Sequence, residues 1–301
     1  MKMNVWKTFG FPWKKEELQK WSSLKKTAYL LLPLFVYFAV HDIAEILLYF
    51  LLNVLGTAGG EEVAAFISRH VYTIRGMVYG AASLIGVASI LTVVKGEIAV
   101  PLADEKDKAE KQQIDGKRVT AYCFLAVFAL CIAAGINFLF WGAGFSDSSQ
   151  TYNEVHKMQY GVQFAAGLFL YGFISPLAEE AVFRGILYNR MKRCFNDKIA
   201  LVVSSLLFGI YHGNLVQAVY GTILGLLIAY FYERYKSFAA PVLFHGVANI
   251  SVFAMTYQSS LVDMGRGQAI AAGAGFLVAA AGIFFYMKRR IILDESGGHI
   301  G

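Results

Sequence analysis

The sequence predicts an all-α, polytopic membrane bundle of about eight transmembrane helices. Its 301 residues are 57% hydrophobic and only 16% charged, and the mean hydropathy is +0.51, whereas soluble domains are about 25% charged. A helix needs ~20 apolar residues to cross a bilayer, so a chain of this length has room for roughly seven to nine of them. We therefore expect one membrane-embedded domain and no sizeable soluble one.

Long apolar runs place the expected helices, and basic residues orient them. The runs lie near residues 27–55, 71–94, 119–141, 160–187, 199–212, 215–232, 238–257 and 269–287. Lysine and arginine gather in the connections 95–118, 188–198 and 233–237 and in the tail after residue 287. Segments rich in these residues remain in the cytoplasm. Eight crossings with this pattern predict that both termini are cytoplasmic.

Four parts follow from this reading. They are a basic cytoplasmic or interfacial segment (1–26), N-terminal transmembrane helices (27–158), a core of helices that carries the candidate site (159–290) and a cytoplasmic tail (291–301). Seven lysines precede the first span, with bulky apolar residues between them. The lysines favour a segment that is retained in the cytoplasm over an arm that binds anionic lipid or nucleic acid, and the apolar residues suggest that it lies on the bilayer surface. We expect no nucleic-acid partner. The first apolar run is too long for the core of a cleavable signal peptide.

The first candidate motif is Glu179-Glu180-x-x-x-Arg184, in the last third of the fourth expected span. A charge in hydrocarbon costs about 2.5–3.5 kcal/mol on insertion scales, so it needs a partner or a function. Helical spacing puts Glu180 and Arg184 on one face in the favourable order for an ion pair, while Glu179 points about 100° away. We expect Arg184 to hold Glu180 and Glu179 to act as a general base. The alternative is an ion-paired cluster at the cytoplasmic membrane edge.

Two further motifs place imidazoles in apolar helices. Phe208-x-x-x-His212 puts a ring and an imidazole on one face, and His245-x-x-x-Asn249 stacks an imidazole and a carboxamide one turn apart. The second pair can donate two hydrogen bonds to one oxygen atom, as the oxyanion of acyl transfer requires. Taken singly, His212 fits a structural donor, and the His245/Asn249 pair fits interhelical hydrogen bonds of about 0.6 kcal/mol each. Together, the motifs predict one assembled site.

This ordered set of motifs resembles the CPBP family of intramembrane proteases, which comprises CAAX prenyl endopeptidases and bacteriocin-processing (Abi) enzymes. The resemblance covers about residues 160–251 and includes every motif in the family's order. It implies an eight-helix intramembrane peptidase whose site opens toward the cytoplasm. The first 150 residues carry no motif that can be assigned, so the resemblance does not identify the substrate.

The resemblance also implies roles for the motif residues. In this chain Glu179 and His212 would activate water, His245 and Asn249 would stabilise the tetrahedral intermediate, and Glu180 with Arg184 would orient the site. Family members are often called metalloproteases, and a metal-free glutamate mechanism is also argued for them. Zinc is one expected cofactor, with Glu179, Glu180, His212 and His245 as candidate ligands. The absence of a His-Glu-x-x-His motif weakens the case for zinc relative to soluble zincins.

Counting residues raises a question of depth. At ~1.5 Å per residue, His212 lies about 21 Å along the fifth expected span from Lys198. Glu179 lies about 28 Å along the fourth span, which runs the other way. The two side chains meet only if the helices tilt or if their ends extend beyond the bilayer. We expect the extension, because the stretch through Arg193 is longer than a bilayer requires.

A second polar cluster, His41, Asp42 and Glu45, lies in the middle of the first span. His41 and Glu45 share a helix face, so the cluster is the best argument for the rival class, a transporter or channel with a proton relay or ion site. Alternatively it supports the catalytic bundle or lines a wet vestibule. A third possibility is a catalytically silent immunity or adaptor protein that retains the motifs.

The sequence favours an intramembrane endopeptidase that acts on membrane-associated or lipidated peptides or proteins. A lipidated Cys-a-a-X protein, a small secreted peptide and a membrane-protein regulator all fit a site that is reached from the cytoplasm. The basic flanks and low charge indicate a multi-pass protein of a bacterial plasma membrane, which favours peptide or membrane-protein processing. The three cysteines suggest neither disulfides nor a thiolate metal site. The sequence does not set the oligomeric state.

Overall fold

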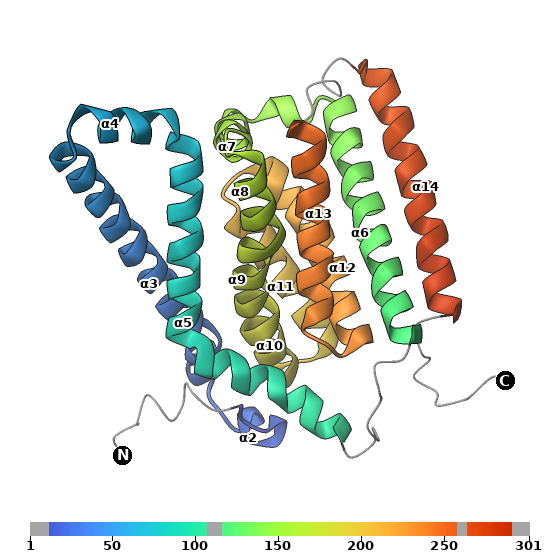
Figure 1. Cartoon of the computed structure of the whole chain (residues 1–301). Helices are drawn as coiled ribbons and strands as arrows, with labels where there is room; N and C mark the ends of the chain where they lie inside the picture. Colours follow the sequence, from blue (N-terminus) through green and yellow to red (C-terminus); the bar gives the residue numbers. More distant parts are fainter. Residues whose placement is uncertain (1–11, 107–115, 258–263, 291–301) are drawn as a thin grey trace, which may run out of the picture.

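A computed structural model describes residues 12–106, 116–257 and 264–290, and every regular element in these ranges is helical (Figure 1). This confirms the predicted all-α class. The elements are α2 (Lys15–Gln19), α3 (Ser23–Ala58), α4 (Gly60–Arg69), α5 (Val71–Lys106), α6 (Gly116–Gly142), a 3₁₀ turn (Ser146–Ser148), α7 (Gln150–Tyr160), α8 (Phe164–Phe169), α9 (Ser175–Glu180), α10 (Asn189–Cys194), α11 (Asp197–Tyr211), α12 (Leu215–Tyr235), α13 (Ala239–Tyr257) and α14 (Arg266–Arg290). Two π-helical segments, Leu170–Ile174 and Ala181–Tyr188, join α8, α9 and α10 into one helix.

Seven helices of the described chain are long and apolar enough to cross a membrane. They are Ser23–Ala58, Val71–Ala99, Val119–Gly142, Phe164–Cys194, Leu215–Tyr235, Ala239–Tyr257 and Arg266–Arg289. The one expected span missing from this set is the fifth, residues 199–212, which corresponds to α11. Helix α11 has 15 residues and is therefore shorter than the ~20 that a bilayer requires. The chain is a multi-pass membrane protein. Which of its faces is cytoplasmic stays a prediction.

The sequence placed one helix end too early. Helix α5 continues to Lys106, although the prediction ended it at residue 94. The fourth long helix continues past its predicted apolar run to Cys194, in agreement with the expected extension through Arg193. The charged residues there look like loop residues in the sequence, but Glu97 is fully buried and pairs with Arg190 (Nε to Oε1 2.7 Å) and with Arg193. The predicted connection 95–118 is helical as far as Lys106 and again from Gly116, and residues 107–115 lie outside the described residues, as do segments 1–11 and 291–301.

Two buried apolar clusters hold the helices together. One joins α3, α5, the Phe164–Cys194 helix and α11, and includes Ile90 and Phe208. The other joins α6, α12, α13 and α14, and includes Phe231 and Phe244. Apolar side chains also cover the outside, where for example Phe35 is 67% exposed, as expected of surface that faces lipid.

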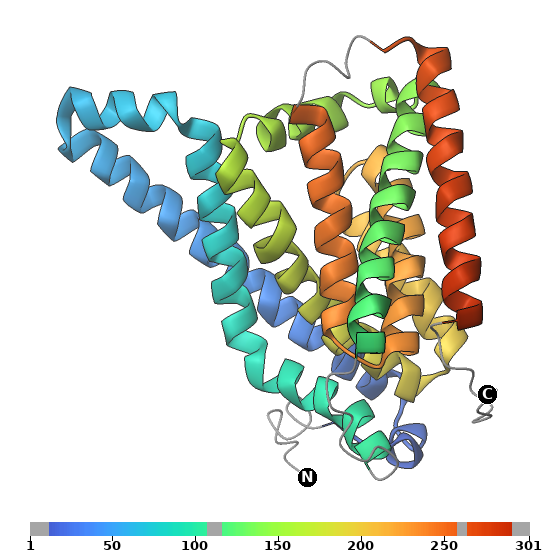
Figure 2. The ribbon, with the colours of Figure 1, turned by 45° about the vertical axis from the view of Figure 1, so that its right-hand side comes forward.

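The bundle has two distinct ends. Helix α4 joins α3 to α5 at one end, where α7 also lies. Figure 2 shows α4 to one side of the other helices. Helices α2 and α10 and the C-terminal end of α14 lie at the opposite end (Figure 1). The basic segments that the sequence assigned to the cytoplasm belong to this second end. They include the α10–α11 and α12–α13 connections.

Candidate functional site

Helix α9 carries the two glutamates, and each has a different environment. Glu179 is 7% exposed, and its Oε1 atom accepts a hydrogen bond of 2.5 Å from the Ser175 hydroxyl, one turn earlier. Its Oε2 atom is buried and has no hydrogen-bond partner within the described residues. A buried carboxylate oxygen without a donor is costly. Glu179 therefore has one oxygen that is held and one that is available to a ligand or water.

Glu180 is fully buried behind this position. Its Oε1 atom accepts hydrogen bonds from Arg184 Nη1 (3.0 Å) and pairs with His245 Nδ1 (2.8 Å). Arg184 also donates to the Gly225 carbonyl (3.0 Å), and its guanidinium lies 4.5 Å from the centre of the Phe208 ring. The geometry thus agrees with the expected pairing of Glu180 with Arg184, and it adds His245 to that pair.

The hydrogen bonds of the two histidines determine which ring nitrogen faces the site. His212 caps the C-terminus of α11, and its Nδ1 atom lies 2.9 Å from the Phe208 carbonyl oxygen. A carbonyl oxygen can only accept, so Nδ1 carries the hydrogen and Nε2 of a neutral ring keeps its lone pair. His245 likewise turns Nδ1 to Glu180, and its Nε2 lies 3.8 Å from Glu179 Oε2.

Asn249 lies one turn after His245 on α13, and its Nδ2 donates to the Tyr171 carbonyl oxygen at 3.2 Å. A carboxamide nitrogen has two hydrogens, so this bond leaves one for a ligand. The described bond orients the Asn249 side chain toward the Phe164–Cys194 helix. The expected convergence of His245 and Asn249 on one oxygen atom is a prediction about a bound ligand, and it stays a prediction.

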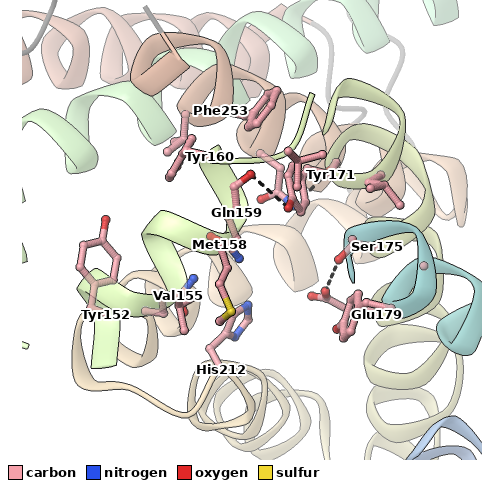
Figure 3. Close-up of a pocket in the computed structure, with 18 of the residues that line it drawn as sticks. Tyr152, Val155, Met158, Gln159, Tyr160, Tyr171, Ser175, Glu179, His212 and Phe253 are labelled. Atoms are coloured by element: carbon pink, nitrogen blue, oxygen red, sulfur yellow. Dashed lines mark hydrogen bonds between the residues drawn. The ribbon is translucent and has the colours of Figure 1, made fainter. Parts of the chain in front are cut away.

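A cavity of about 490 Å³ brings four of the six predicted residues together. Glu179, His212, His245 and Asn249 line it, whereas Glu180 and Arg184 lie behind its wall. Figure 3 shows His212 and Glu179 on different sides of the open space, with the Ser175 hydrogen bond to Glu179. Within the described residues, the motifs predicted from sequence therefore do converge.

The extended fourth helix answers the question of depth. Glu179 lies fifteen residues before Cys194, and His212 lies fifteen residues after Asp197. At ~1.5 Å per residue both are about 22 Å from the turn that joins α10 to α11. The expected continuation of the helix through Arg193 is observed, and it places the two side chains at one level.

The cavity extends from Glu179 toward the end of the bundle that carries α4 and α7. Its wall there includes Tyr49, Tyr72, Ser146 and Tyr152, and Figure 1 places their helices at this end. The basic segments lie at the other end. The sequence predicted that these segments are cytoplasmic and also that the site opens toward the cytoplasm. With this geometry only one of the two predictions can hold, and the membrane side itself is untested.

The expected zinc ligands do not form a compact metal site. Among the described residues, the one group of three or more His, Cys, Asp and Glu side chains with ligand atoms within 4.8 Å of each other is His41, Asp42 and Glu45. Glu180 Oε1 is already engaged by Arg184 and His245, whereas the Nδ1 bonds of both site histidines leave Nε2 as the nitrogen that could bind a metal. The arrangement of Glu179, Glu180, His212 and His245 therefore does not fit a preformed zinc centre, and no chemical step is derived through one.

The second polar cluster lies beside the site. His41 is buried, with Nδ1 at 2.9 Å from Asp42 Oδ1 and with its ring 5.3 Å from the ring of Tyr79. Glu45, one turn on, lines the cavity. This placement agrees with the vestibule reading of the cluster, although its role in transport or catalysis is untested.

Three cavity residues were not predicted from the sequence. Ser175 holds Glu179, and the hydroxyls of Tyr79 and Tyr211 lie 3.0 Å apart in the cavity wall. Ser175 stands four residues before Glu179, so its helix face was a usable signal. Tyr79 comes from the half of the chain without motifs, and only the packing of α5 against the Phe164–Cys194 helix brings it to the site.

The segment that carries the predicted site matches a known protein family. Residues 161–251 match the family model described as type II CAAX prenyl endopeptidase Rce1-like. This confirms the resemblance inferred from the motifs. The Rce1-like segment contains all six predicted site residues and runs from the start of α8 into α13.

A curated relative extends beyond the Rce1-like segment. The chain is 28% identical over 132 residues to "Putative membrane peptidase YdiL" of Bacillus subtilis (strain 168). The match covers 44% of this chain and 52% of the relative, so the chain spans about half the length of the curated relative that it matches. No solved structure matches the chain.

Proposed function

We propose that this protein is an intramembrane endopeptidase in which Glu179 and His212 activate a water molecule. The observation that carries the proposal is the Glu179 carboxylate, which lies in the wall of a cavity with Oε1 held by Ser175 and Oε2 without a partner. A polar cavity wall with a buried acceptor of this kind suits an ordered water. The Rce1-like match and the peptidase name of the relative support the same class of reaction.

The hydrogen-bond pattern supports a division of roles. A water between Glu179 Oε2 and the lone pair of His212 Nε2 donates its hydrogens to both. When the water oxygen attacks the substrate carbonyl carbon, one hydrogen passes to Glu179 as a proton, and the carbonyl oxygen becomes an oxyanion. When the oxyanion collapses, the C–N bond breaks and the proton moves from Glu179 to the departing amine. One C–O bond has then formed and one C–N bond has broken.

His245 and Asn249 are the proposed donors to the oxyanion. Glu180 Oε1 accepts from His245 Nδ1, which holds the ring with Nε2 toward Glu179 and the cavity. To donate from Nε2 as well, the imidazole must carry a hydrogen on both nitrogens, and we propose this form for the step in which the oxyanion develops. Asn249 offers its second Nδ2 hydrogen. Arg184 neutralises the buried charge of Glu180, so the pair keeps His245 oriented without being consumed.

The proposed substrate is a membrane-associated peptide or protein whose scissile bond reaches the cavity from the α4/α7 end. We take the positive-inside pattern as the firmer of the two sequence predictions, because it rests on several basic segments at one end of the bundle. On this basis the cavity faces the non-cytoplasmic side of a plasma membrane. The whole molecule, including α3 and α5, then contributes to substrate access.

The test of the proposal is a comparison of membranes that contain the wild type or Glu179→Gln. We expect one or a few membrane-tethered proteins to accumulate uncut with Glu179→Gln, because the amide cannot accept a proton. Glu61→Gln, the same substitution at an exposed position of α4, is the matched control and is expected to cleave normally. Full cleavage by a well-folded Glu179→Gln variant would overturn the proposal, the same proteins uncut with the wild type and with Glu179→Gln would support a silent scaffold, and ion flux dependent on Asp42 or Glu45 would support the transporter.

The metal requirement has its own test. We propose that hydrolysis does not depend on tightly held zinc, because no three of the candidate ligand atoms lie within 4.8 Å of one another among the described residues. Purified protein is expected to hold much less than one zinc per chain by elemental analysis and to keep its activity after chelation. Stoichiometric zinc that is lost together with activity, and lost again in His245→Ala, would overturn this.

A further inference from the structure

Two tyrosine hydroxyls from separate parts of the chain meet in the cavity wall. The Tyr79 hydroxyl on α5 lies 3.0 Å from the Tyr211 hydroxyl at the end of α11, and both residues line the cavity with Glu179 and His212. Tyr211 directly precedes His212. Packing fixes its ring against Phe183, with the ring centres 5.5 Å apart. The hydroxyl pair is thus a built feature of the wall, with one member from each half of the chain.

The pair lies beside His212. The ring centre of Tyr211 is 5.5 Å from that of His212, which the proposed function places next to the attacking water. Tyr188 is also a buried tyrosine, but it does not line the cavity. The two tyrosines therefore have different positions relative to the proposed reaction centre.

Counting hydrogens shows what the pair can offer. Two hydroxyls carry two hydrogens, and the bond between them uses one. If Tyr211 donates to Tyr79, the hydrogen of Tyr79 is the one left to donate elsewhere. If Tyr79 donates to Tyr211, the hydrogen of Tyr211 is left for the cavity. The second arrangement makes Tyr211 a stronger donor, because a hydroxyl that accepts a hydrogen bond is polarised by it.

We propose that Tyr211 is a further catalytic residue, whose hydroxyl donates a hydrogen bond to the substrate carbonyl oxygen as negative charge develops there, and that Tyr79 is its positioning residue. This inference rests on the proposed peptidase function. A neutral phenol is a donor that takes up no proton near neutral pH, so in this reaction it serves the oxyanion and not the attacking water. Placed donors of this kind act mainly on the transition state.

The experiment uses the full chain in lipid vesicles and a fluorogenic peptide that spans a cleavage site found in the Glu179→Gln comparison. Loss of one oxyanion donor typically lowers kcat about 10²–10³-fold, so Tyr211→Phe is expected to lower kcat about 100-fold and to change KM less than about twofold. Tyr79→Phe is expected to lower kcat about tenfold, since the donor remains but is less polarised. Tyr188→Phe, the same change at a buried tyrosine that does not line the cavity, is the matched control and is expected to keep wild-type kcat.

A structural role predicts other results. If Tyr211→Phe keeps wild-type kcat, or changes KM alone, the inference is wrong. Should Tyr211→Phe fail to fold, fluorotyrosine at position 211 keeps the ring and hydroxyl but makes the hydroxyl more acidic; an unchanged kcat would then overturn the inference. Glu179→Gln separates the two proposals. Turnover by that variant would remove the proposed function, whereas its inactivity beside a fully active Tyr211→Phe would remove only this inference.

Discussion

Glu179 and Glu180 are neighbours in the chain, yet helix geometry gives them separate tasks. About 100° of rotation between successive residues turns Glu179 into the cavity and Glu180 into the protein. Glu180 then lies between a guanidinium and an imidazole, both within 3.0 Å of its Oε1 atom. The buried charge fixes one histidine, and the cavity charge stays available for chemistry.

This division predicts different stabilities for two matched variants. Glu180→Gln removes the negative charge beside Arg184, which is fully buried, and breaking a buried pair in this way costs about 3–5 kcal/mol. Glu179 has no lysine or arginine partner among the described residues, so Glu179→Gln leaves no buried cation unpaired. We expect thermal unfolding in detergent to show a marked loss of stability for Glu180→Gln and little change for Glu179→Gln. Equal melting temperatures would mean that Arg184 is compensated in another way.

At the residue scale the sequence predicted the groups of the site but not all their partners. Helical spacing was sufficient for Glu180 with Arg184, because both lie on one helix. It could not show that Glu180 also contacts His245, or that Tyr79 meets Tyr211, because these pairs join residues far apart in the chain. Such contacts depend on the packing angles of helices, which periodicity does not determine.

At the element scale, close helix approach positions α13 against the glutamates. A Cβ atom on Gly246 would lie 2.2 Å from the carbonyl oxygen of Gly172, which is backbone and cannot move alone. The π-helical segments on both sides of α9 belong to the same helix. Such segments are rare in proteins, and those that do occur are often found at functional sites. The position of His245 thus depends on a glycine that is its neighbour in the chain.

Gly246→Ala is therefore expected to displace α13 and to separate His245 from Glu180. We predict a lower melting temperature and at least a tenfold loss of kcat in the peptide assay, because small shifts of reacting groups are costly. Gly275→Ala is the matched control: it lies within α14, nothing is within 4 Å of its added Cβ, and alanine favours a helix. Wild-type turnover by Gly246→Ala would show that the helix interface can adjust.

Element boundaries were predicted well where apolar runs end in exposed residues and poorly where they end in buried charge. Glu97 shows the reason. In the sequence it follows Lys95 and looks like the start of a loop, but in the structure it is fully buried against Arg190 and Arg193. Hydropathy assigns charge to water, so it cannot recognise a charge whose partners come from another helix. The short helix α11 was predicted with nearly its observed bounds, 199–212 against Asp197–Tyr211, although it is not long enough to be a candidate membrane span.

At the scale of the whole molecule, the site is shared between a recognisable core and a half without motifs. The Rce1-like match covers residues 161–251. Helices α3 and α5 lie outside it, yet they supply Glu45, Tyr49, Tyr72 and Tyr79 to the cavity wall. The proposed catalytic groups and the proposed access route therefore come from different parts of the chain, which is why motifs alone do not identify the substrate.

The membrane side of the cavity is the largest question at this scale, and single cysteines can answer it. The three natural cysteines, Cys123, Cys131 and Cys194, are first replaced. One new cysteine is then placed at Glu62, at the α4 end, or at Lys198, at the basic end; both positions are exposed. Acidic residues contribute little to topology, so Glu62→Cys does not disturb the orientation that it reports.

With intact bacterial cells and a membrane-impermeant maleimide, we expect Glu62→Cys to react and Lys198→Cys to react only after permeabilisation. Ser146→Cys, in the cavity wall, is expected to react from outside as well, and its modification should block cleavage, because the adduct occupies the route to Glu179. The reverse pattern would place the basic end outside and the cavity on the cytoplasmic side. In that case the positive-inside reading is wrong for this chain, the sequence-based expectation of cytoplasmic access is right, and substrates must be sought among proteins anchored to the inner leaflet.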